Sequence, residues 1–137
     1  MRIAIITINE DGGKLAKKLK ENFNDCTVVK LQKSETQKLE KIFNEYDGLI
    51  FIAALGIVVR RIRPFIRNKL SDPAVVCVDT AGRFAISVIC GHEGGANNLA
   101  YLAAGYLEAQ AVITTGTEAH KKIILGVGCR KGISADK

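Results

Sequence analysis

The chain has 137 residues, of which 47% are hydrophobic and 25% are charged. This composition is typical of a single folded domain with a core of ordinary size, and it excludes a disordered chain. No apolar segment reaches the roughly 20 residues that a membrane helix needs, and the first residues are typical of a strand rather than a signal peptide. We therefore expect a cytoplasmic protein with no membrane partner.

The first half of the chain alternates apolar segments with amphipathic ones. Strands are predicted at 2–8, 26–31 and 47–55, because each segment is short, apolar and rich in β-branched residues. Helices are predicted at 9–23 and 34–46, where leucine and isoleucine recur at helical spacing among lysines and glutamates. This alternation favours a parallel sheet that is covered by helices on both faces.

The second half adds a hairpin to this pattern. Asp79 and Gly82 suit a type I turn between two apolar strands, and Pro64 is expected to end or kink the helix before them. The elements predicted here are a helix, two strands, a long helix and a last core strand, at 56–64, 73–79, 83–90, 94–109 and 111–115. The predicted fold is α/β, a three-layer, mostly parallel, flavodoxin-like open sheet with a local antiparallel hairpin.

The cysteines do not indicate a metal site. The four of them are widely separated, and neither a C-x-x-C pair nor a cluster of cysteine and histidine occurs. A chain of this size needs no disulfides, and three of the cysteines lie inside apolar segments. We expect buried, reduced thiols and no metal ligands.

Most of the net charge of +6 comes from one segment. Residues 60–69 carry five basic side chains and no acidic one, so the other 127 residues sum to +1. Arg60, Arg63 and Arg67 are spaced i, i+3, i+7 and share one helical face if the helix continues past Pro64. Guanidinium groups grip carboxylates or phosphates, so these three are candidate substrate-binding residues. A solvated basic face is the alternative, and nucleic acid is disfavoured because only Phe65 could stack on bases.

The segment ICGHEGGANNLA, residues 89–100, joins a predicted strand to a predicted helix. His92 can accept or donate a proton near neutral pH, and Glu93 could orient its ring or act as a base itself. Backbone N–H groups at Gly94 and Gly95 are candidate donors to an oxyanion. His92 and Glu93 are the candidate catalytic residues. An ordinary strand–turn–helix connection is the alternative.

Other polar residues extend this candidate site. Asn97 falls in the first turn of the predicted helix, where its amide could face a ligand. Thr114 and Thr115 follow a predicted strand, and ligands of open α/β sheets bind beyond the carboxyl ends of strands. The glycine spacing matches neither a Walker loop nor a dinucleotide fingerprint, but an anion at the helix N-terminus keeps a nucleotide- or phosphate-binding module open.

Several segments resemble one known family. ALGIVVRRI, DPAVVCVDTAGRFAISVICGHEGGANNLA and AVITT are similar to the N-terminal and central regions of CbiG, the cobalt-precorrin-5A hydrolase family of anaerobic cobalamin biosynthesis. The resemblance implies an anionic cobalt-corrinoid substrate, whose δ-lactone is opened with release of acetaldehyde. It implies no cofactor, because the cobalt arrives in the substrate. The carboxylates on such a ring would suit the arginines.

The sequence also departs from the family pattern. Cys90 stands where Ser is typical, and residues 116–118 read GTE where ATD is typical. The tail GVGCRKGIS resembles the start of the family's C-terminal domain, so we expect a family-like α/β domain over 1–121 and a stub over 122–137. A non-catalytic corrinoid- or partner-binding module of a split enzyme is therefore the alternative function. Its partner would be a separate C-terminal protein, and a homo-oligomer stays open.

Overall fold

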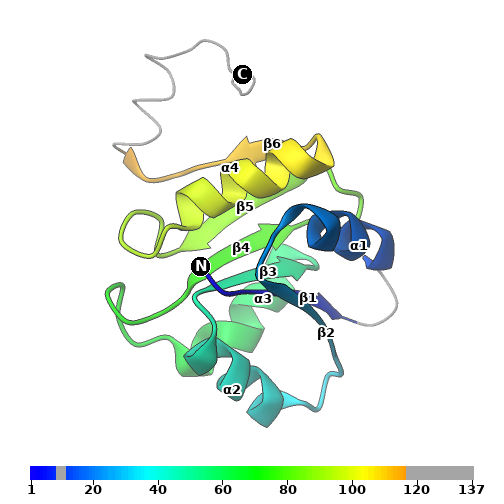
Figure 1. Cartoon of the computed structure of the whole chain (residues 1–137). Helices are drawn as coiled ribbons and strands as arrows, with labels where there is room; N and C mark the ends of the chain where they lie inside the picture. The colour runs from blue at the N-terminus through cyan, green and yellow to red at the C-terminus, as the bar shows by residue number, and fades with distance from the viewer. Residues whose placement is uncertain (9–11, 117–137) are drawn as a thin grey trace.

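The structure is a computed structural model that describes residues 1–8 and 12–116. In that part of the chain, a six-stranded sheet is flanked by four α-helices and one short 3₁₀ helix (Figure 1). The strands are β1 (Ile3–Ile8), β2 (Cys26–Leu31), β3 (Gly48–Ile52), β4 (Ala74–Val78), β5 (Phe84–Ile89) and β6 (Gln110–Val112). The helices are α1 (Gly13–Asn22), α2 (Thr36–Glu45), α3 (Leu55–Ile62), η1 (Arg63–Phe65) and α4 (Ala96–Leu107).

Both faces of the sheet are covered, which confirms the three-layer prediction. Every residue of β1 and of β3 is buried. Ile3 and Ile5 belong to an apolar cluster with residues of α1 and α4, whereas Ala4 and Ile6 belong to a second cluster with residues of α2 and α3. Side chains alternate between the faces of a strand, so a continuous apolar run is the pattern that fills two cores at once.

The sheet changes direction at the hairpin. The strand order is β2-β1-β3-β4-β5-β6, with β4 and β5 antiparallel and every other neighbouring pair parallel. Asp79 fixes the turn, because its Oδ1 accepts hydrogen bonds from the backbone N–H groups of Arg83 and Phe84 at 2.8 and 2.7 Å. The carboxyl ends of β5 and β6 therefore lie at the end of the sheet where β1, β3 and β4 begin.

Some predicted bounds were wrong. The strand predicted over 111–115 is β6, which ends at Val112. The α-helix predicted up to Pro64 ends at Ile62, and η1 follows with Pro64 inside it. The boundary expected after residue 121 lies outside the described residues, as does the tail that resembles a second domain. Among the helices that the structure describes, none is long and apolar enough to span a bilayer.

Candidate functional site

Two loops meet at the end of the sheet where β4 begins and β5 ends. The loop of residues 66–73 leads into β4, and the loop of residues 90–95 joins β5 to α4 (Figure 1). Val75 near the start of β4 pairs with Ile89 at the end of β5, which places the two loops beside each other. The topology thus brings the end of the basic segment to the glycine-rich junction.

A small hollow lies between these loops, with a volume of about 260 Å³. Its lining combines apolar and polar side chains, which are Ile66, Asn68, Lys69, Asp72, Ile89 and Cys90. A space of this size holds one substituent of a large ligand rather than a whole macrocycle.

Backbone geometry makes the junction compact. Cys90 and Gly95 have φ angles of +61° and +86°, and a Cβ at Gly94 would lie 2.5 Å from the Cβ of Cys90. The N–H groups of Ala96 and Asn97 donate to the carbonyls of Cys90 and Gly91 at 3.0 and 3.1 Å. Two N–H groups of the first turn of α4 are therefore already hydrogen-bonded to the loop. This weakens the case for a phosphate site at this helix N-terminus.

The two glycines that precede α4 keep their donors available. Within residues 1–8 and 12–116, the backbone N–H groups of Gly94 and Gly95 donate no hydrogen bond to another residue. The predicted oxyanion donors are thus unpaired and lie in the loop that borders the hollow. The two glycines are partly exposed.

His92 and Glu93 are both exposed in the loop of residues 90–95. The Glu93 carboxylate lies 4.0 Å from the Nζ of Lys69, in an ion pair between the two loops. No hydrogen bond joins Glu93 to His92 among the described residues. Glu93 therefore pairs with Lys69 and does not orient the histidine ring in this structure. The exposed imidazole of His92 forms no hydrogen bond or ion pair within the described residues.

Asn97 is turned into the fold. It is 3% exposed, and its Nδ2 donates a hydrogen bond to Thr115 Oγ1 at 3.0 Å, while its Oδ1 has no partner among the described residues. A Cβ at Gly91 would lie 2.8 Å from that Oδ1. Asn97 thus connects the chain after β6 to the glycine junction, which is a positioning contact. Thr114, which precedes Thr115 in the chain, is exposed.

Cys90 occupies the wall of the hollow but is poorly suited to act as a nucleophile. Burial raises the pKa of its thiol above the ordinary value, and the negative charges of Asp72 and Glu93 raise it further. The thiol form therefore dominates at neutral pH, whereas the thiolate is the reactive form.

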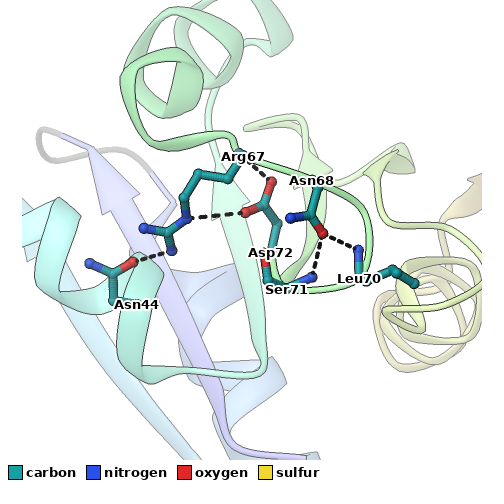
Figure 2. Close-up of polar contacts among 6 residues, drawn as sticks. All are labelled: Asn44, Arg67, Asn68, Leu70, Ser71 and Asp72. Atoms are coloured by element: carbon teal, nitrogen blue, oxygen red, sulfur yellow. Dashed lines mark hydrogen bonds and ion pairs between the residues drawn. The ribbon is translucent and has the colours of Figure 1, made fainter.

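The predicted row of three arginines does not form. The α-helix ends at Ile62, and the chain is extended at Ile66, so Arg67 leaves the helical face of Arg60 and Arg63. Arg67 instead donates from Nη2 to Asn44 Oδ1 at 2.7 Å, and its Nε lies 4.0 Å from Asp72 Oδ1 (Figure 2). None of these arginines lines the hollow. The cation that reaches it is Lys69.

Asp72 was missed in the sequence. Its side chain is 1% exposed, and its Oδ2 accepts the backbone N–H of Arg67 at 2.8 Å, which holds the loop in place. The available signal was its position as the first acid after a long basic run and directly before a proline.

Comparison with known proteins fixes the family. Residues 37–118, well over half of the chain, match the family described as Cobalamin synthesis G N-terminal. The chain belongs to this family. The matched range contains both loops and every described residue of the candidate site.

Curated relatives of this Cobalamin synthesis G family member carry one name. It is 38% identical over 136 residues to the cobalt-precorrin-5A hydrolase of Priestia megaterium, a match that covers 88% of this chain and 36% of the relative. It is 36% identical over 129 residues to the enzyme of the same name from Salmonella typhimurium, covering 87% and 37%. This chain thus spans little more than a third of the length of the curated relatives.

A solved structure supports the fold of this family member. The putative cobalamin biosynthesis protein G homolog from Sulfolobus solfataricus superposes with a TM-score of 0.71 at 29% identity. The match covers 90% of this chain and 40% of that chain.

Proposed function

We propose that this chain acts in the hydrolysis of cobalt-precorrin-5A, the reaction for which its curated relatives are named. The observation that carries the proposal is the junction at residues 90–95, inside the family-matched range. It contains an exposed imidazole and two backbone N–H groups that are unpaired within the described residues, and its first residue, Cys90, lines the hollow. These are the components that acyl hydrolysis requires, a group that transfers a proton and donors for an oxyanion.

The proposed chemistry is the opening of a lactone by water. His92 accepts a proton from water as the water oxygen bonds to the lactone carbonyl carbon. The N–H groups of Gly94 and Gly95 donate to the oxyanion. When the ring C–O bond breaks, the leaving oxygen takes the proton back from His92, which yields a carboxylic acid and an alcohol. Release of acetaldehyde follows from the resemblance to the family.

Lys69 lines the hollow and supplies the positive charge that such a substrate needs there. Its side chain is 72% exposed, and among residues 1–8 and 12–116 its one partner is Glu93, at 4.0 Å, which is itself exposed. An exposed pair of this kind contributes little, about 0–1 kcal/mol, so a carboxylate arm of the corrinoid can replace Glu93. The cobalt belongs to the substrate in this proposal.

We place the reaction in the cytoplasm. The thiols of Cys26, Cys77 and Cys90 are free in the part of the chain that the structure describes, as is usual in a reducing compartment.

The test measures acetaldehyde release and the absorption spectrum of cobalt-precorrin-5A during incubation with the chain. His92→Ala should lower turnover by ~10²–10⁴-fold, the usual effect of removing a general base, whereas exposed Lys41→Ala on α2 should not. Wild-type turnover by His92→Ala would remove His92 from the mechanism.

A second function is favoured by the length of the match. Because the relatives are far longer, the chain could bind the corrinoid without turning it over, with activity that needs further polypeptide. Spectral binding of the corrinoid with no acetaldehyde selects this function. Failure to bind the corrinoid at all contradicts both proposals.

A further inference from the structure

The outward face of α3 combines exposed apolar and basic side chains. Val58 and Ile62 point into the core, being 0% and 1% exposed. On the other side of the helix, Leu55 and Val59 are 41% and 45% exposed, although they lie i, i+4 and could pack as a pair. The pair adds a small exposed apolar area to this face of the helix.

Two arginines on this face have no partner. Arg61 donates to the carbonyl of Gln32 at 3.1 Å, and Arg67 is bound to Asn44. In contrast, Arg60 and Arg63 are exposed and form no hydrogen bond or ion pair within the described ranges. We define the α3 face as Leu55, Val59, Arg60 and Arg63.

The loop that follows presents a further apolar side chain on an ordered turn. Leu70 is 78% exposed, yet its backbone N–H donates to Asn68 Oδ1 at 2.8 Å, and the N–H of Ser71 donates to the same oxygen at 3.0 Å (Figure 2). These bonds order the backbone of the turn that carries Leu70.

The candidate site does not use the α3 face. None of its four residues lines the hollow, and α3 packs against the sheet face opposite to that of α4. The face therefore has the properties of a binding surface but no ligand within the proposed hydrolysis.

We propose that the α3 face docks an acidic surface of the additional polypeptide that the curated relatives carry. This chain matches only 36% and 37% of two such relatives, and the α3 face presents two exposed cations, Arg60 and Arg63, with no acid among its four residues. Complementary charge around an apolar centre fits a protein interface. A second copy of this chain is disfavoured because its own α3 face has the same charge.

The test mixes this chain with a probe, the Priestia megaterium relative from which the region matched here has been removed. Sedimentation measures the complex, after circular dichroism shows that the probe unfolds cooperatively. Arg60→Glu with Arg63→Glu should weaken the complex about tenfold or more, and Val59→Asp should do the same. The matched control is Lys14→Glu with Lys17→Glu, an i, i+3 pair on α1 with the same charge change. The control should weaken the complex less than about twofold, as expected for charges outside an interface.

Equal weakening by both double variants, or no complex with a folded probe, would overturn the proposal. The proposal would also be overturned if this chain bound phosphatidylglycerol vesicles instead of the probe and the α3 variants abolished that vesicle binding. If the probe does not fold, a hybrid is tested instead, in which this chain replaces the matched region of the relative. In the hybrid, Arg60→Glu with Arg63→Glu should lower the melting temperature. The same double variant should leave the melting temperature of the isolated chain unchanged. Equal shifts in the hybrid and in the chain alone would also contradict the interface. None of these readouts depends on turnover, so they stand apart from the hydrolase test.

Discussion

The backbone N–H of Arg67 donates a 2.8 Å hydrogen bond to the buried Oδ2 of Asp72, and this bond closes the loop that carries Lys69 to the hollow. The same arginine reaches Asn44 on α2 with its guanidinium (Figure 2). A residue that the sequence places among substrate anchors is therefore held at both ends by the fold.

Asp72→Ala should destabilise the protein by about 2 kcal/mol, because hydrogen bonds to charged groups contribute about 1.5–3 kcal/mol. Asp72→Asn keeps an acceptor for the Arg67 N–H and should lose about half as much. Urea unfolding followed by circular dichroism measures both. The control is Asp25→Ala at an exposed position, expected within about 0.5 kcal/mol of wild type. Identical stability of Asp72→Ala and wild type would contradict a structural role for this carboxylate.

Substitution by alanine should change the stability of the protein in opposite directions at Gly95, the N-cap of α4, and at Gly105 within α4. Gly95 has a φ of +86°, a conformation that costs a residue with a Cβ about 1 kcal/mol or more, so Gly95→Ala should destabilise. Gly105 lies within α4 with open space around its Cα, so Gly105→Ala should stabilise by about 0.5–1 kcal/mol. Thermal unfolding reports both shifts. A stabilising Gly95→Ala would mean that the junction does not have this backbone conformation.

The bond between Asn97 and Thr115 should appear as a coupling energy. In a double-mutant cycle of Asn97→Ala and Thr115→Val, we expect about 0.5–1.5 kcal/mol, the usual net value of one hydrogen bond. The matched cycle with Thr114→Val should give a coupling near zero, since Thr114 is exposed and does not bond Asn97. Equal couplings in the two cycles would refute the positioning contact.

Stability should fall in alkaline solution because of Cys77. Burial raises the pKa of this thiol from 9.0 to about 11, and the charge of Asp79 adds to the effect. The unfolded chain therefore loses its thiol proton first, and the free energy of unfolding decreases as the pH rises from about 9 to 11. The full shift corresponds to about 2–3 kcal/mol.

Comparison of wild type with Cys77→Ala isolates this effect from the other groups that titrate in the same range. Urea unfolding at pH 8, 9, 10 and 11 gives the two curves. Their difference should shrink as the pH rises, because the alanine variant has no thiol to lose. Parallel curves over the whole range would show that Cys77 titrates alike in both states.

The sequence alone determined the layered α/β fold and the position of the hairpin along the chain. Continuous apolar runs such as Ile3–Ile8 fit only strands buried on both faces, and Asp79 and Gly82 specified the hairpin through local turn geometry. These features depend on neighbours in the chain, so the pattern of residue types is enough to predict them. The strand order and the partners of the charged side chains could not be predicted from this pattern.

Only the tertiary structure decided which residues meet. The antiparallel hairpin turns the ends of β5 and β6 toward the start of β4, which brings Lys69, rather than the arginines, to Glu93. It also turns Asn97 inward to Thr115 and buries Asp72 beneath Arg67. The reason is physical: a hydrogen bond or ion pair depends on distances of a few ångströms between residues far apart in sequence, and only the packed sheet fixes those distances.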